Sequence, residues 1–229
     1  MRVAPYNRGM GVVRVVAWAA VSVYATIPLY WITTHGWIGH WRRHGSAGRA
    51  FRPLVLLWVI YIAAATAVTA RWRHDVMLLP NLRWARLLIA LVCWIPAWLI
   101  YRRIREFGFG RFVGRVELQA DTKPSTPERA PASSAQDTGA AQRLVTGGMH
   151  AYVRHPIYLG HLLTACGWVI AGGSVACLAL LAFALATGAV MLQMEEGELV
   201  SRFGDEYRAY RARTPLIVPR SMRVFRGGG

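Results

Sequence analysis

Apolar residues gather along this chain in long blocks that are separated by short polar and basic segments. Three blocks cover residues 12–33, 53–70 and 84–101, and a longer one covers residues 157–191. A membrane-crossing helix needs ~20 apolar residues in succession, so each of the first three blocks is long enough for one span. The pattern therefore predicts membrane-spanning helices.

The fourth block is too long for a single span and is interrupted near its middle. Residues 171–174 have the sequence Ala-Gly-Gly-Ser, which favours a tight reversal between two shorter helices. We therefore predict an all-α integral membrane bundle of about five transmembrane helices, with a C-terminal helical hairpin and short interfacial helices. The first block is too long for the core of a secretory signal and ends without small residues, so we expect it to be retained as a span.

The composition supports a membrane protein, because 55% of the residues are hydrophobic and only 17% are charged. The formal net charge of +16 would also fit a nucleic-acid-binding protein, so the positions of the basic residues matter. With five spans, segments 34–52, 102–156 and 193–229 lie on one side of the membrane and hold four, nine and seven Lys or Arg residues. The N-terminus, segment 71–83 and the hairpin tip hold two, three and none.

This asymmetry predicts the orientation of the chain, since loops rich in Lys and Arg stay on the cytoplasmic side of a membrane. We expect a multi-pass protein of the bacterial inner (plasma) membrane, with the N-terminus outside and the C-terminus and active site in the cytoplasm. Topology and attraction to anionic lipid headgroups account for the positive charge, so no nucleic-acid partner is expected.

The cysteine and histidine positions predict neither a disulfide nor a metal site. Cys93, Cys166 and Cys177 lie inside apolar blocks without CxxC spacing, which is typical of buried free thiols. Further histidines occupy predicted loops, share no metal-ligand spacing and are expected to face solvent: His35, His40, His44 and His74. No metal is therefore expected.

The change of composition along the chain indicates three parts. Residues 1–115 carry three spans and short basic loops, and we interpret them as a membrane scaffold. Residues 116–142 are rich in Asp, Thr, Pro, Ser and Ala, cannot bury enough apolar surface to fold, and are predicted to be a flexible cytoplasmic linker. Residues 143–229 carry most of the polar motifs and are expected to form the functional site.

Polar and ionisable groups lie directly at the start of the fourth span. Pro156 suits the first turn of a helix, where its missing N–H costs nothing, and Arg154 and His155 come immediately before it. The free backbone N–H groups of that turn, together with these two side chains, favour binding of an anion at the membrane surface.

The fifth span continues past the membrane interface as a polar helix. Glu195 and Glu198 share one helical face, with Glu198 expected on the solvated side, whereas Glu196 points ~100° away. Gly204 is expected to end this helix, and a short helix follows over residues 205–213. Because the hairpin turns the chain back, these glutamates and the Arg-His pair before the fourth span meet at one membrane boundary.

Two motifs in this region resemble those of a known family. Residues 154–160, with the sequence RHPIYLG, resemble the RHPxYxG segment of the isoprenylcysteine carboxyl methyltransferase family and its phospholipid methyltransferase relatives. Residues 195–210 resemble the EExxLxxxFGxxYxxY element of the same family. The resemblance covers about residues 143–220, and the first 142 residues match only in being membrane spans.

The resemblance implies a membrane methyltransferase that depends on S-adenosyl-L-methionine, with a cofactor pocket capped by the C-terminal segment and open sideways to the bilayer for a lipophilic substrate. Residues assigned to cofactor binding on this basis are Tyr152, His155, Pro156, Tyr158, Gly160, Glu196, Tyr207 and Tyr210. Residues assigned to catalysis are Arg154, Glu195 and Arg213. The tyrosines at 207 and 210 could equally pack a surface helix at the interface.

Methyl transfer from this cofactor requires such groups. The methionine end of the cofactor carries a carboxylate and an ammonium, which call for a cation such as Arg154 and an anion such as Glu195 or Glu196. Arg213 could hold an anionic substrate group in line with the methyl group. Which glutamate contacts the cofactor stays open, as does the methyl acceptor: an isoprenylcysteine-like carboxylate, a thiol, a phospholipid amine or a phenolic lipid.

Two other functions fit parts of the sequence. Sterol-reductase-like membrane enzymes that use NADPH share an RHPxY element, but they typically carry Asn after RHP and an acidic residue after the glycine, where this chain has Ile157 and His161. A non-enzymatic basic scaffold could bind anionic lipids through the Arg-rich tail, but it leaves the carboxylate cluster without a role. Binding of S-adenosylhomocysteine, of NADPH or of neither would separate the three functions.

Overall fold

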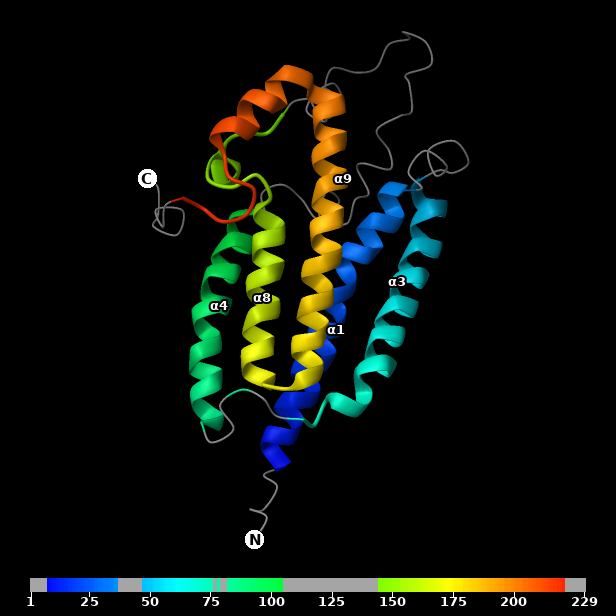
Figure 1. Ribbon diagram of the computed structural model, residues 1–229, viewed down its shortest axis with the longest axis vertical. Helices are drawn as coiled ribbons and strands as arrows, with labels where there is room; N and C mark the ends of the chain where they lie inside the picture. The colour runs from blue at the N-terminus through cyan, green and yellow to red at the C-terminus, as the bar shows by residue number, and fades with distance from the viewer. Residues whose placement is uncertain (1–7, 37–46, 76–77, 79–81, 105–143, 221–229) are drawn as a thin grey trace, which may run out of the picture.

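The computed structural model of this chain describes residues 8–36, 47–75, 78, 82–104 and 144–220. Within these ranges the chain forms helices and connecting turns and contains no strand, which confirms the predicted all-α class. The helices run up and down in an elongated bundle (Figure 1). The linker predicted at 116–142 lies outside the described residues, as do the histidines at 40 and 44.

In the described part of the chain, 4 helices are long and apolar enough to cross a membrane. They are α1 (Arg8–Gly36), α3 (Ala47–Thr69), α4 (Arg83–Ile104) and α9 (Val175–Arg213). A further apolar helix, α8 (Pro156–Gly172), has 17 residues and is therefore about 25 Å long, slightly less than the ~30 Å hydrocarbon core. The predicted multi-pass helical bundle is confirmed, and α8 is its short member.

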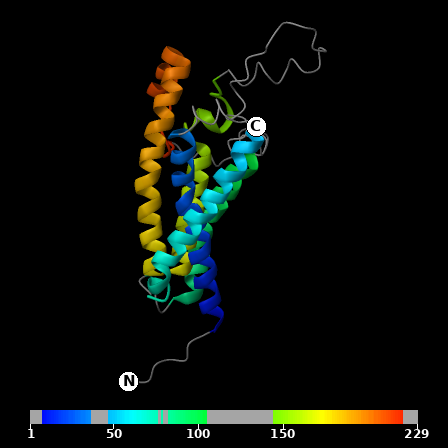
Figure 2. The same cartoon turned by 90° about the vertical axis from the view of Figure 1, so that its right-hand side faces the viewer.

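Helix α1 lies at the centre of the bundle. It packs against α3 and against both helices of the C-terminal hairpin, α8 and α9, while α4 packs against α8. In Figure 1, α8 lies between α4 and α9, and α3 lies at the outer edge of the bundle. Figure 2 shows that α9 continues well beyond the end of α8. Helix α1, in the N-terminal half of the chain, therefore covers the space between α8 and α9.

The centre of the bundle is built largely from small side chains. Ala17, Val21 and Ala25 of α1 are buried against Val169 of α8 and Cys177 of α9. Small residues let helix backbones approach closely, which is how helices associate in lipid, where apolar burial supplies little driving force. Large apolar side chains on the outer surfaces of α3 and α4 are exposed, as expected for contact with a membrane. All three cysteines are free thiols, but only Cys177 is buried; Cys93 and Cys166, also expected to be buried, are partly exposed.

The predicted reversal within the fourth apolar block is a tight turn between α8 and α9. Gly173 ends α8 in the left-handed conformation (φ 61°), and the Ser174 side chain caps α9 by accepting a hydrogen bond from the Cys177 N–H. The fully buried Arg86 of α4 donates to the Gly172 carbonyl (3.3 Å) and so ties the turn to α4. A β-carbon at position 173 would lie 1.9 Å from Arg86 Nη1. The turn therefore requires glycine both for its left-handed backbone conformation and for the lack of space beside Arg86.

The open end of the hairpin is covered by the C-terminal part of α9 and the chain after it. The helix changes direction at Gly204 (φ 56°, ψ −128°), where the sequence predicts a helix end. The chain then returns to the start of α8, where the Arg154 N–H donates to the Pro215 carbonyl (2.9 Å) and the His155 N–H donates to the Leu216 carbonyl (3.1 Å). Figure 1 shows this segment folded over the end of α8.

Candidate functional site

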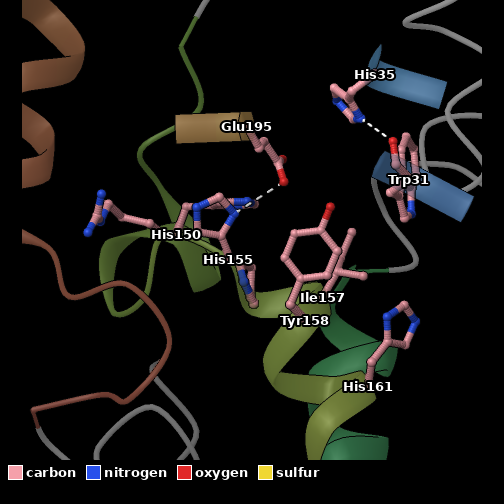
Figure 3. Close-up of a pocket in the computed structure, with 10 residues that line it drawn as sticks. Trp31, His35, His150, His155, Ile157, Tyr158, His161 and Glu195 are labelled. Carbon is pink, nitrogen blue, oxygen red and sulfur yellow. Dashed lines mark hydrogen bonds and ion pairs between the residues drawn. The ribbon is translucent and has the colours of Figure 1, made fainter. Parts of the chain in front are cut away.

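A polar cavity lies at the open end of the hairpin. Side chains from α1, α8, α9 and the segment before α8 converge on it, and its volume is about 100 Å³ (Figure 3). It is lined by Trp31, His35, His150, Arg154, His155, Pro156, Ile157, Tyr158, His161 and Glu195. The structure therefore brings together ionisable groups from the start of α8 and from the part of α9 beside it, as the sequence predicts.

The Glu196 carboxylate joins several polar groups behind the cavity wall. It accepts hydrogen bonds from the Arg154 guanidinium and the Tyr207 hydroxyl, and its Oε1 lies 2.8 Å from His155 Nε2. Arg211 Nε lies 3.6 Å from Oε2. Glu196 is only 8% exposed, and these partners compensate for the loss of water around its charge. Glu196 thus links the segment before α8 to the part of α9 that follows the kink at Gly204.

Glu195, the preceding residue, faces the cavity. Figure 3 shows its carboxylate directed towards His155, and Oε2 lies 3.7 Å from His155 Nδ1. This oxygen is buried and forms no hydrogen bond within the described residues. A buried carboxylate oxygen that lacks a hydrogen-bond donor is costly unless a ligand supplies one. Glu195 is therefore well placed to meet a cationic group of a ligand.

His155 lies between the two carboxylates and is held in a fixed orientation. Its ring stacks on Tyr158, with centroids 5.6 Å apart and 26° between the ring planes. Its side chain is 4% exposed, and its backbone N–H is bound to the returning C-terminal segment. Because each ring nitrogen faces a different carboxylate, the ring cannot turn without losing one of these contacts.

The short helix η3 (Gly148–Ala151) forms another part of the wall and is fixed by the C-terminal helix. The Tyr210 hydroxyl donates to the His150 carbonyl (2.7 Å). Burial, together with the nearby His155, lowers the pKa of His150 to about 4, because both disfavour the imidazolium form. His150 is therefore neutral at physiological pH, and Arg154 is a permanent cation of the cavity wall.

The predicted site residues occupy different positions relative to the polar cavity, and their roles remain predictions. Those that line the cavity are Arg154, His155, Pro156, Tyr158 and Glu195. Those that lie behind it and are buried are Glu196, Tyr207 and Tyr210. Gly160 packs against the Tyr101 ring, where an added β-carbon would lie 2.9 Å from Cε1. Tyr152 and Arg213 are exposed and do not line the cavity.

Residues of α1 also line the cavity, which the sequence does not predict. The expectation that His35 lies in a loop and faces solvent is wrong, because it belongs to the last turn of α1 and its side chain is 10% exposed. Its Nδ1 is 2.9 Å from the Trp31 carbonyl oxygen, and its Nε2 is 3.5 Å from Glu198 Oε2. No local signal could reveal this contact, because it forms only when α1 and α9 pack together. His74 is exposed, as predicted.

A second, apolar cavity of about 220 Å³ adjoins the polar one inside the bundle. Its walls come from α1, α8 and α9, with Ile217 of the C-terminal segment, and they contain no Lys or Arg among the described residues. Tyr158 and His161 line both cavities. The polar cavity at the end of the bundle thus borders an apolar space between its helices.

These features define a class of protein: an all-α membrane protein with a polar cavity at the end of a C-terminal hairpin and an apolar cavity beside it. In the described ranges, no group of three or more His, Cys, Asp or Glu side chains could hold a metal ion. Residues 133–206 match the phospholipid methyltransferase family. The predicted resemblance to this group of membrane methyltransferases is confirmed for the C-terminal part of the chain.

Curated methyltransferases of two kinds are similar to this chain. It is 40% identical over 79 residues to the protein-S-isoprenylcysteine O-methyltransferase of Schizosaccharomyces pombe, a match that covers 33% of this chain and 33% of that protein. It is 42% identical over 74 residues to methanethiol S-methyltransferase 2 of Bradyrhizobium diazoefficiens, covering 31% of this chain and 27% of that protein. The chain therefore spans only about a third or less of the length of these relatives. No solved structure matches it.

Proposed function

We propose that this chain is a membrane methyltransferase that uses S-adenosyl-L-methionine as methyl donor and a lipophilic or membrane-partitioned molecule as acceptor. The observation that carries this proposal is the junction of the polar and apolar cavities at Tyr158 and His161. A charged donor and a lipophilic acceptor have to meet at such a boundary for methyl transfer. The similarity of the C-terminal part to membrane methyltransferases supports the same function.

The residues of the polar cavity fit the methionine end of this donor. Pro156 begins α8, and the free N–H groups of a helix N-terminus, together with the Arg154 guanidinium, favour a carboxylate. Glu195 Oε2, buried and without a hydrogen bond in the described residues, is suited to accept one from an ammonium group. A cavity of about 100 Å³ matches this end alone, since sites for drug-sized ligands have ~300–1,000 Å³. The rest of the donor therefore extends beyond the polar cavity.

The bound donor supplies an electrophilic methyl group on a sulfonium sulfur. Transfer requires an acceptor held in line behind that methyl group, so positioning contributes most of the rate enhancement. Glu196 keeps Arg154 and His155 in place, and so fixes the groups that orient the donor. Tyr158 and His161 line both cavities, so a donor in the polar cavity and an acceptor in the apolar cavity would meet beside them.

Calorimetric titration of the full-length protein, purified in detergent, tests this proposal. We expect S-adenosylhomocysteine, the demethylated product of the donor, to bind and NADPH not to bind. Binding of NADPH alone would favour the sterol-reductase-like function instead. Binding of neither compound would favour a non-enzymatic basic scaffold.

A further inference from the structure

His161 is an ionisable side chain inside an otherwise apolar helix, and the donor contacts proposed above give it no role. It lies on α8 about 9 Å deeper along the helix axis than His155. Figure 3 shows it beyond Tyr158, on the side away from Glu195. Ionisable side chains inside membrane helices are costly, which makes each of them a candidate for function.

The surroundings of His161 hold its ring at the boundary between the two cavities. The ring centroids of Tyr24 from α1, Tyr101 from α4 and Tyr158 from α8 lie 5.7, 5.8 and 6.4 Å from its own. The charged and titratable groups that line the polar cavity with it are His35, His150, Arg154, His155 and Glu195. The imidazole is therefore enclosed by neutral aromatic rings and opens towards the polar cavity.

The apolar cavity is poorly suited to an anionic acceptor. Its described lining contains no Lys or Arg, and its polar side chains are Tyr24, Tyr158 and His161. A carboxylate that entered this space would lose its water without gaining a cationic side chain from the described lining, which is costly. A thiol or a phenol is neutral before reaction and enters without that cost.

A neutral thiol or phenol has to lose its proton during methyl transfer. Imidazole is the side chain used most often as a general base, and general-base catalysis requires it within hydrogen-bonding reach of the acceptor. His161 is placed at the boundary where a lipophilic acceptor from the apolar cavity meets the donor site.

We propose that His161 is the general base for methyl transfer and that the acceptor is a neutral lipophilic thiol or phenol, an inference that rests on the methyltransferase function proposed above. As the bond between the acceptor sulfur or oxygen and the methyl carbon forms, the methyl–sulfonium bond breaks and its electron pair stays on the donor sulfur. The proton of the acceptor S–H or O–H moves to an imidazole nitrogen of His161. That proton then leaves through the polar cavity, onto which His161 also opens.

The test uses the full-length protein in detergent with S-adenosylmethionine and three alternative acceptors: decanethiol, octylphenol and decanoic acid. We expect the wild type to methylate the thiol or the phenol and not the carboxylate, measured as release of S-adenosylhomocysteine. His161→Gln should lower kcat/KM for that acceptor by ~100-fold or more, the usual contribution of a general base. The remaining rate should rise with pH as the acceptor ionises, whereas the wild-type rate should level off at lower pH.

Affinity for S-adenosylhomocysteine separates this inference from the proposed function. We expect His161→Gln to bind it like the wild type, and His74→Gln, the same change at an exposed histidine, to match the wild type in every assay. If His161→Gln fails to fold, His161→Phe, which keeps a ring among the tyrosines, and the pH profile of the wild type decide the question.

Several results would overturn the role of His161 while the methyltransferase function stands. They are methylation of the carboxylate or of none of the three acceptors, an unchanged rate in a folded His161 variant, or a wild-type rate that follows acceptor ionisation without levelling off. Failure of the wild type to bind S-adenosylhomocysteine would instead overturn the methyltransferase function itself.

Discussion

The carboxylates of Glu195 and Glu196 are chemically identical neighbours in very different surroundings. Glu196 is 8% exposed and is bonded to the Arg154 guanidinium and the Tyr207 hydroxyl. Glu195 has a buried oxygen that forms no hydrogen bond within the described residues. We infer that Glu196 holds the site together and that Glu195 is available to a ligand.

Substitution of each carboxylate by its amide should separate ligand binding from stability. We expect Glu195→Gln to keep its melting temperature and to bind S-adenosylhomocysteine ~10-fold more weakly or worse, because a charge-assisted hydrogen bond of ~1.5–3 kcal/mol becomes a neutral one. Glu196→Gln should weaken this binding and, in addition, lower the melting temperature, because it leaves the buried Arg154 guanidinium without its counter-ion. Thermal melting and calorimetry measure both effects, with exposed Glu206→Gln as the control. Equal losses of melting temperature in both variants would contradict this division.

His150 should make the stability of the site depend on pH. Its pKa is lowered from 6.5 to about 4 by burial and by His155, so the folded protein binds a proton there less readily than the unfolded chain. The stabilisation from neutral His150 is thus complete above about pH 6.5, declines as the pH falls, and is lost by about pH 4. We expect the melting temperature of His150→Gln to decline less steeply over this range than that of the wild type. Parallel declines of the two melting temperatures would show that His150 contributes nothing to the pH dependence of stability.

At the scale of elements, the hairpin of α8 and α9 positions the site, and its two ends are fixed by different means. At the tip, the Arg86 guanidinium binds the carbonyl that ends α8. At the open end, the extended chain after α9 binds the N–H groups of Arg154 and His155. The greater length of α9 carries Glu196 and Tyr207 past the start of α8, where they can reach these residues.

Two glycine-to-alanine changes test how strongly the hairpin tip is specified. We expect Gly173→Ala to lower the melting temperature, since alanine disfavours a φ of 61° and its β-carbon would lie 1.9 Å from Arg86 Nη1. Gly197→Ala, inside α9 with no atom within 4 Å of the added β-carbon, should be neutral or raise stability by up to ~1 kcal/mol. Thermal melting in detergent compares the two. A larger loss from Gly197→Ala would contradict the packing at the tip.

At the scale of the whole molecule, the hairpin tip and the polar cavity lie at opposite ends of α8. Helix α1 runs past both: Ala17 packs near Cys177, close to the tip, while Trp31 and His35 reach the polar cavity. Helix α1 thus supplies one wall of each cavity.

The orientation expected from the basic residues can be tested with reporters. Fusions at residues 125 and 229 should both report the cytoplasm, because the segments rich in Lys and Arg remain there. A cysteine introduced as His74→Cys, in the exposed turn after α3, should react with a membrane-impermeant thiol reagent added from outside. Reporters at 125 and 229 on opposite faces would contradict the number of spans.

Local sequence alone determined much of this architecture. The lengths of the apolar blocks predicted the membrane helices, and the small residues at 171–174 predicted the reversal between the last two. Pro156 marked the start of α8, and Gly204, expected to end a helix, marks the kink at which α9 changes direction. These predictions succeed because transfer of ~20 apolar residues into lipid and the backbone preferences of Pro and Gly are properties of the local chain.

Only the tertiary structure decided which polar side chains face the polar cavity. Glu195 and Glu196 differ by ~100° around their helix, so they cannot share a direction, but the packing of α8 determines which of them meets the cavity. His35 reaches the site, whereas Arg213, a predicted site residue, lies exposed outside it. A sequence pattern records the faces of one helix and not which helix each face will meet, because that choice depends on contacts between residues far apart in the chain.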